Sequence, residues 1–374
     1  MVDENNTEKI YSTGFASLIA NLISAAFFGI GTYKIFAECN NDAYIAAIIG
    51  IIASILPLTM LIFINKNSKG LDIIDLNINL LGKFFGNILN IVLNVTYFFI
   101  TVVIFYNITE FLSIYYLPDT SIIYIQLMLL VVITFASGKN MVVISKISQL
   151  VFIINMIFFL TCQLGIFEEF NLERIYPVMQ NGINPVVKGS LMYFLLAAFP
   201  IFLVTIIPSY KLEYDKNSTK KISIFYFLAH LVLLVIIFTT ILTLGKELIL
   251  IYRYPEYYGL KTFSLFKILE RLENTLSLQF IFTMFIFIVM CFKFITISVG
   301  KIVKLKNIDK IFPYVLSILL VILVNKFFEN LNQPRSIALD SFDKIAGAGI
   351  LIPMLITTVK ILIDKQVEKS KKTK

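Results

Sequence analysis

Residues that could carry out chemistry are few in this chain, and their spacing argues against an enzyme. His230 is the single histidine, and the three cysteines, Cys39, Cys162 and Cys291, are scattered through apolar stretches. Metal centres and disulfide frameworks need such residues in groups at defined spacings. The sequence also lacks a recognisable nucleophile–base pair and a glycine-rich phosphate loop. We therefore expect no catalytic residue, no metal and no cofactor.

Five other residues are notable because they lie inside long apolar segments. Glu110 and Lys293 place charges there, which is costly in a membrane and makes each a functional hypothesis. They could pair, although the rise along their helices separates them in depth. Gly29, Gly31 and Pro200 are helix-breaking candidates, because glycine lets the chain leave helical geometry and proline deletes a backbone donor. Simple packing or kinking is the alternative for all three.

The amino-acid composition indicates the class of protein in which these residues lie. The chain has 374 residues, of which 58% are hydrophobic and only 15% charged, and its mean hydropathy is +0.85. An ordinary globular chain carries about 25% charged residues. A polytopic, all-α membrane protein is therefore predicted, and soluble enzymes, nucleic-acid binders and disordered scaffolds are excluded.

The hydropathy pattern predicts about ten transmembrane helices, since a span needs about 20 mainly apolar residues. The segments are roughly 12–36, 43–65, 88–113, 121–137, 141–166, 189–209, 221–245, 277–300, 311–328 and 341–363. With the N-terminus inside, the inner connections carry twice as many Lys and Arg residues as the outer ones. The positive-inside rule then predicts that both termini are cytoplasmic.

Three stretches outside the spans have a recognisable character. Residues 70–87 alternate polar and apolar positions at helical spacing, which suits a helix lying in the inner interface. The outer connection 246–276 contains SLFKILERLEN, which is typical of a second amphipathic helix. A solvated connector is an equally good interpretation of each. Residues 364–374 form a basic cytoplasmic tail, expected to be disordered and to lie against anionic lipid.

Ten spans divide into two sets of five with opposite starting sides. We therefore predict a single membrane domain over 1–374, with one repeat at about 12–166 and a second at about 189–363. Such inverted repeats form a ligand site near the midplane from interrupted helices. Gly29 and Gly31 in span 1 and Pro200 in span 6 occupy equivalent positions of the two halves, which favours functional breaks in both spans.

Several stretches in order along the chain resemble one family of membrane proteins, the B subunits of the GerA-type spore germinant receptors in the amino acid–polyamine–organocation (APC) superfamily. They are AECNNDAYIAAIIG at the start of span 2, EFLSIYYLPDTS at the end of span 3, NLERIYPVMQNGINPVVKGS before span 6, Pro208 after it, and LKTFSLFKILERLENT before span 8. The chain departs from the family pattern in span 6, where Phe199, Pro200 and Ile201 replace the usual Gly-x-Glu.

The resemblance implies a LeuT/APC-type fold and a nutrient-sensing role. Such subunits lie in the spore inner membrane with an A subunit and a lipoprotein C subunit, and they trigger germination when a small nutrient, typically an amino acid, binds. Membrane lipid is the other expected partner, and no nucleic acid is expected. Two alternatives stay open: a proton- or sodium-coupled amino acid permease of the same fold, and a structural subunit with a vestigial pocket.

The fold implied by the resemblance also indicates which residues line the pocket. They come from the breaks of spans 1 and 6 and from the middle of spans 3 and 8: Ala25, Gly29, Tyr97, Thr101, Ala198, Phe199, Phe287 and Cys291. Free backbone N–H groups at the span 1 break would suit a ligand carboxylate. A backbone carbonyl is the alternative partner for the Thr101 hydroxyl, and core packing is the alternative role for Phe287 and Cys291.

Overall fold

The computed structural model describes residues 9–213, 217–261, 273–304, 308–328 and 341–372. Within them, eight helical segments are long and apolar enough to cross a membrane, and two shorter apolar helices accompany them. The helices corresponding to the ten predicted spans are α1 (Ser12–Phe27) with α2 (Ile30–Cys39), α3 (Ala43–Ala53) with α4 (Ile55–Asn67), α5 (Ile73–Tyr115), α6 (Ile122–Ser137), α7 (Met141–Ile166), α8 (Ile183–Ile201), α9 (Ser218–Ile251), α11 (Glu273–Val303), α12 (Ile308–Phe328) and α14 (Phe342–Lys372).

The connections contain short elements. A seven-residue helix, α10 (Pro255–Lys261), lies between α9 and α11. The 3-10 turns are η2 (Asn40–Asp42), η3 (Phe167–Glu169), η4 (Leu172–Ile175), η5 (Phe202–Ile206) and η6 (Ser209–Lys211). Two-residue strands β1 (Ile10–Tyr11) and β2 (Leu212–Glu213) pair in parallel. Because β1 precedes span 1 and β2 follows span 6, this pair joins the start of span 1 to the end of span 6, the first spans of the two predicted repeats.

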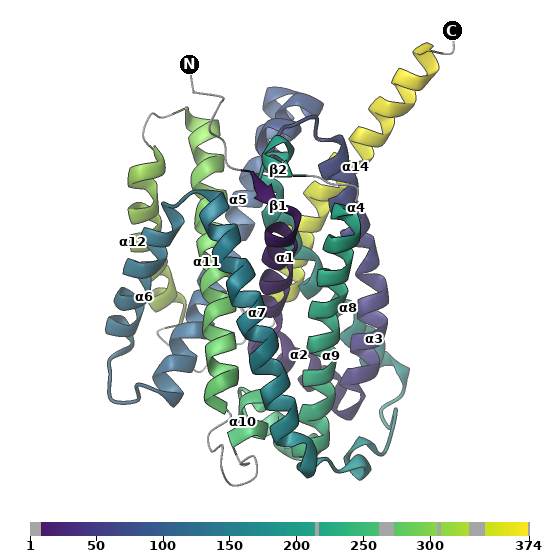
Figure 1. The fold of residues 1–374 in the computed structure, drawn as a ribbon, viewed down its shortest axis with the longest axis vertical. Helices are drawn as coiled ribbons and strands as arrows, with labels where there is room; N and C mark the ends of the chain where they lie inside the picture. Colours follow the sequence, from purple (N-terminus) through teal and green to yellow (C-terminus); the bar gives the residue numbers. More distant parts are fainter. Residues whose placement is uncertain (1–8, 214–216, 262–272, 305–307, 329–340, 373–374) are drawn as a thin grey trace.

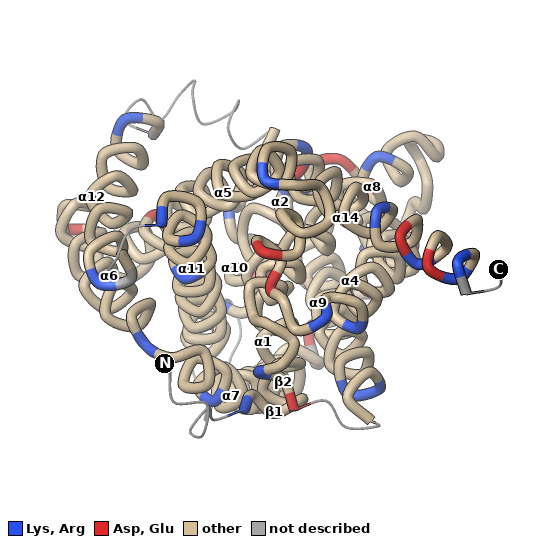
Figure 2. Tube along the Cα trace, turned by 90° about the horizontal axis from the view of Figure 1, so that it is seen from above, with Lys and Arg blue, Asp and Glu red and all other residues tan. Residues whose placement is uncertain are grey.

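Figure 1 shows a bundle with both termini at one end and α10 at the other. The helices α6 and α12 lie together on one side, away from the central α1. In the view along the bundle, most of each helix is uncharged, and the end of α14 near the C-terminus carries charges of both signs (Figure 2). This distribution is that of an integral membrane protein, whose apolar helix surfaces face lipid.

The first span is divided by a short non-helical stretch, as its glycines predict. The helix α1 ends at Phe27, and α2 begins at Ile30 after Gly29, whose φ is +74°. Gly31 lies within the first turn of α2 and packs against the Ala26 carbonyl. The sixth span changes character directly after Pro200, because α8 ends at Ile201 and continues as the 3-10 turn η5. Both predicted interruptions are therefore present.

The chain outside the spans agrees with the sequence in one place and differs in another. Residues 73–81 form a separate helical stretch, because Gly82 is non-helical (φ +78°) and divides α5. The basic tail, expected to be disordered, is instead helical as far as Lys372, and a Lys360–Asp364 pair at 2.9 Å lies at its start. Helix propensity of the Lys- and Glu-rich end outweighs its polarity. Most of SLFKILERLEN lies outside the described residues.

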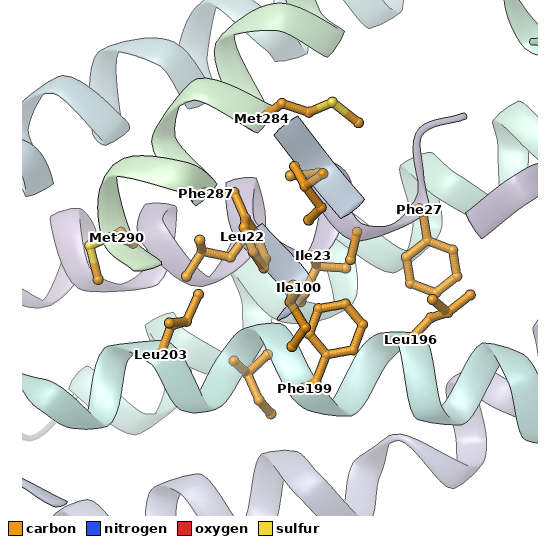
Figure 3. Packing of buried hydrophobic residues seen from close by; sticks show 14 of the residues in the cluster. Leu22, Ile23, Phe27, Ile100, Leu196, Phe199, Leu203, Met284, Phe287 and Met290 are labelled. Atoms are coloured by element: carbon orange, nitrogen blue, oxygen red, sulfur yellow. The ribbon is translucent and has the colours of Figure 1, made fainter. Parts of the chain in front are cut away.

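Apolar side chains from α1, α5, α8 and α11 converge at the centre of the bundle (Figure 3). Leu22, Ile100, Phe199 and Phe287 are each wholly buried. Helices pack closely here because small residues allow it: a Cβ on Gly50 of α3 would lie 2.6 Å from the Tyr193 side chain of α8. The broken spans therefore run through a dense core and not along its edge.

An ion pair fixes the second half of span 1 to the last span. Lys34 on α2 pairs with Asp343 at the start of α14, with side chains 10% and 1% exposed. We expect Asp343→Ala to destabilise the protein by about 3–5 kcal/mol, because a buried ammonium loses its carboxylate partner. Thermal unfolding in detergent measures this loss. A Lys34→Met/Asp343→Leu double variant should recover most of it, and equal destabilisation of the double variant would contradict the prediction.

Candidate functional site

The candidate site is the break between α1 and α2, and its free N–H group is occupied by a side chain from α10. The Glu256 Oε1 atom accepts hydrogen bonds from the Gly29 backbone N–H (2.8 Å) and from the Thr32 hydroxyl (3.0 Å). Helix N-termini attract carboxylates because their first N–H groups lack helical partners. The break thus has a free backbone N–H, as the sequence analysis expected, and a Thr32 hydroxyl that it did not expect, and together they hold a carboxylate of the chain itself.

At the same break, a backbone carbonyl group accepts a hydrogen bond from α5. The Asn107 amide donates to the Phe28 carbonyl (3.0 Å). The Tyr254 hydroxyl shares its single proton between the Asn107 side-chain oxygen (3.0 Å) and backbone carbonyl (3.1 Å). Tyr254 also limits the space at the break, since a Cβ on Gly29 would lie 2.7 Å from its ring. A network from α5 and the segment leading into α10 therefore holds the broken backbone.

The environment of Glu256 perturbs its carboxyl group. The residue lies outside the spanning helices but is only 5% exposed, and its Oε2 atom is buried without a hydrogen-bond partner among the described residues. Burial raises the pKa of Glu256 to about 7, against the opposing effect of hydrogen bonds from its own backbone, Gly29 and Thr32. The group is therefore placed to change charge near neutral pH.

This pKa gives a testable dependence of stability on pH. Because the folded protein binds the Glu256 proton more tightly than the unfolded chain does, the stabilisation is complete below the usual value of 4.5 and is lost as pH rises to about 7. At about 1.4 kcal/mol per pH unit, wild-type protein should lose about 3 kcal/mol relative to Glu256→Gln over this window. Thermal midpoints measured in parallel across pH test it, and parallel curves for the two proteins would contradict it.

The break of span 6 is held from α5. The Tyr97 hydroxyl donates to the Phe199 carbonyl (3.2 Å), at the point where α8 gives way to η5. The Thr101 hydroxyl donates to the Tyr97 carbonyl (2.7 Å), the backbone partner considered as the alternative in the sequence analysis. The Cys291 thiol of α11 lies within hydrogen-bonding reach of the Thr101 hydroxyl. Tyr97 therefore faces the broken helix, whereas Thr101, one turn further along α5, lies beside Cys291 of α11.

The residues expected to line a pocket are all buried in one region of the bundle. The Phe199 and Phe287 rings lie 6.1 Å apart and are both visible in Figure 3. The complete set, in chain order, is Ala25 and Gly29, Tyr97 and Thr101, Ala198 and Phe199, and Phe287 and Cys291, on α1, the break, α5, α8 and α11. Their arrangement is compatible with a closed site, and their role in binding stays a proposal.

The two intramembrane charges have different surroundings. The Glu110 carboxylate forms an ion pair with Arg253 and accepts hydrogen bonds from the hydroxyls of Tyr106 (2.7 Å) and Tyr254 (3.3 Å). Lys293 is partly buried on α11. Glu110 therefore joins α5 to the segment that carries α10, close to the Asn107 network.

Glu256 and Tyr254 were missed by the sequence analysis, which treated residues 246–276 as an outer connection. The signal that could have found them is the stretch YRYPEYYG. Its aromatic residues are too apolar for a solvated loop, and its one carboxylate follows a proline that suits the first turn of a helix. That pattern is typical of a short helix packed into the protein.

Similarity to known proteins identifies the family of this chain. A family model described as spore germination protein matches residues 12–333. The chain belongs to this family. Within the match, two of the stretches quoted above meet in space: the Asp42 carboxylate accepts hydrogen bonds from the Met179 N–H at 2.9 and 3.1 Å.

A curated relative agrees with this assignment over part of the sequence. Spore germination protein B2 of Bacillus subtilis (strain 168) is 30% identical over 150 residues, which are 39% of this chain and 40% of that protein. The aligned part thus spans less than half the length of the curated relative.

Solved structures establish the fold. A mutant of the Eremococcus coleocola manganese transporter has a TM-score of 0.67 at 12% identity, over 94% of this chain and 78% of the transporter. The same transporter in complex with an aromatic bis-isothiourea substituted compound has a TM-score of 0.64 at 12% identity, over 96% and 82%. The chain therefore has the LeuT/APC-type fold of this transporter, and neither its family nor these structural neighbours are enzymes.

Proposed function

We propose that this spore germination protein is the nutrient-sensing membrane subunit of a germinant receptor. The observation that supports the proposal most directly is the break of span 1, where Gly29 and Thr32 present donors to a carboxylate in the middle of the chain's own fold. Groups that can hold a carboxylate in a dense apolar bundle suit a small nutrient such as an amino acid. Binding there would move α2 against α1 and so change the shape of the subunit.

The proposed role implies a membrane, an orientation and partner subunits for this protein. It would lie in the spore inner membrane with both termini cytoplasmic, as the Lys and Arg bias predicts, and α10 would then face outwards, where a nutrient arrives. It would act with A and C subunits of a receptor complex. The pocket would be lined by the set that includes Ala25, Tyr97, Thr101 and Phe287, all buried around the two breaks.

A spore experiment tests the proposal. We expect spores lacking this gene to lose dipicolinate release in response to one nutrient among a panel of single amino acids and simple sugars, and to respond normally to the others. Complementation with the wild-type gene should restore the response. Complementation with Ala25→Leu should not, if assembly of the receptor is intact, because the larger side chain overpacks the buried surroundings of Ala25 beside the break. Unchanged responses to the whole panel would contradict a sensing role.

An amino acid permease is the second candidate, and the transporter-like fold supports it. Net uptake of labelled amino acids into liposomes containing the purified protein separates the two. Span 6 has no acid at the position where its family usually carries one, and this favours sensing without ion-coupled transport. Uptake driven by a proton or sodium gradient would establish the permease and replace the sensing proposal.

A further inference from the structure

Glu256 occupies the place that a ligand carboxylate would take at the broken span. Its Oε1 atom binds the Gly29 N–H and the Thr32 hydroxyl, which are the first donors of the ten-residue helix α2. A free carboxylate bound to this helix would need the same two donors. The chain therefore already fills its own anion site, with a side chain that comes from a separate helix 227 residues along the sequence.

The carboxylate of Glu256 is held by these donors and not by a basic side chain. The ion pairs among the described residues do not include it, and the neighbouring Arg253 pairs with Glu110 instead. Its second oxygen, Oε2, is buried and lacks a hydrogen-bond partner in the same part of the chain. A buried oxygen without a hydrogen bond is destabilising, so Glu256 is bound less tightly here than a carboxylate with both oxygens hydrogen-bonded would be.

Space at the site favours exchange over simultaneous binding. Two cavities flank Glu256, one beside Thr240 and Thr243 and the other beside Phe111 and Phe280, and each has a volume of about 10 Å³. Such a volume holds about one water molecule. A ligand of amino acid size therefore does not fit beside the bound Glu256 carboxylate. It needs the space that Glu256 and α10 fill.

We propose that Glu256 is an internal carboxylate ligand that closes the anion site of α2, and that a free carboxylate binds to Gly29 and Thr32 only after α10 has withdrawn it. The identity of the competing carboxylate in the spore rests on the proposed function: it would be the carboxylate of the nutrient. Exchange of one carboxylate for the other would move α10 at the end of the bundle opposite the termini (Figure 1). Ligand binding inside the bundle would thereby change its surface.

Chemical rescue tests the internal ligand without knowledge of the nutrient. The full-length protein is purified in detergent at pH 8, and thermal midpoints are measured with increasing acetate or with acetamide, its neutral isostere. We expect Glu256→Ala to have a lower midpoint than wild type and to recover several degrees with acetate in a saturable manner. Acetamide should also stabilise this variant, because burial at the site favours a neutral acceptor, as the raised pKa of Glu256 indicates. Wild type should not respond to acetate, because its own carboxylate fills the site.

Glu273→Ala is the matched control. Glu273 is also a buried acid whose Oε2 atom lacks a partner among the described residues, but it lies at the start of α11 and not at the break. Its variant should not recover with acetate. Glu256→Ser leaves a similar space and provides the same comparison if Glu256→Ala does not fold. Equal effects of acetate on the Glu256 and Glu273 variants, or no effect on either, would overturn the internal ligand.

The physiological competition has its own readout in spores. Spores carrying Glu256→Ala should respond to about tenfold lower nutrient concentrations than wild type, because the nutrient no longer displaces a competitor. An unchanged or higher threshold alongside acetate rescue would overturn the competition. Failure of the proposed function is recognised separately, by wild-type responses in spores lacking the gene, and the acetate comparison does not depend on that result.

Discussion

Gly29→Ala should abolish the nutrient response of spores and lower the thermal midpoint of the purified protein. Gly29 has a φ of +74°, a conformation that costs an L-residue about 1–3 kcal/mol. The added Cβ would also lie 2.7 Å from the Tyr254 ring and 2.9 Å from the Asn107 side-chain oxygen. These groups hold the break and cannot move without losing their mutual hydrogen bond, so overpacking adds a further loss of about 1–3 kcal/mol.

Gly182→Ala separates the two causes. Gly182 precedes α8 and has nearly the same φ of +75°, and apart from its chain neighbours no atom of the described residues lies within 4 Å of its ideal Cβ position. This variant carries backbone strain without a clash, so it should lower the midpoint less and leave the nutrient response in place. Similar losses in both variants would show that the close fit of Tyr254 and Asn107 around the break does not matter.

The spans and their breaks were predictable because each depends on local properties of the chain. Hydropathy alone locates the ten spans, since a membrane helix must be apolar over its whole length. Gly29 and Pro200 mark the interruptions because their backbone effects do not depend on their neighbours. The helical end of the chain was missed because its polarity was weighed more heavily than the helix propensity of its Lys and Glu residues.

The occupant of the site was not predictable in the same way. The stretch YRYPEYYG indicates a packed helix around Glu256, but it does not indicate which element the side chain contacts, and Gly29 is 227 residues away. Its contact depends on the arrangement of α9, α10 and α5, which periodicity does not encode. The same holds for Glu110: its position inside a span identified it as important, but its partner Arg253 follows from the fold alone.

Arg253→Met should destabilise the protein by about 3–5 kcal/mol, because it leaves the Glu110 carboxylate buried without its cation. The two side chains are only 18% and 9% exposed, and Arg253 also stacks over the Tyr106 ring at 5.6 Å. The loss should be largest around α10, since Arg253 lies just before it. Thermal unfolding measures the total effect, and hydrogen exchange of residues 252–261 measures the local one.

A double variant and an exposed pair make this result specific. Glu110→Gln removes the buried charge while keeping an acceptor for the Tyr106 and Tyr254 hydroxyls, so Glu110→Gln/Arg253→Met should be more stable than Arg253→Met alone. Lys188 and Glu38 form a pair at 3.4 Å with side chains 70% and 27% exposed, and Lys188→Met should change stability by less than about 1 kcal/mol. If Arg253→Met has no larger effect than Lys188→Met, the Glu110 pair does not hold α10 against the broken span.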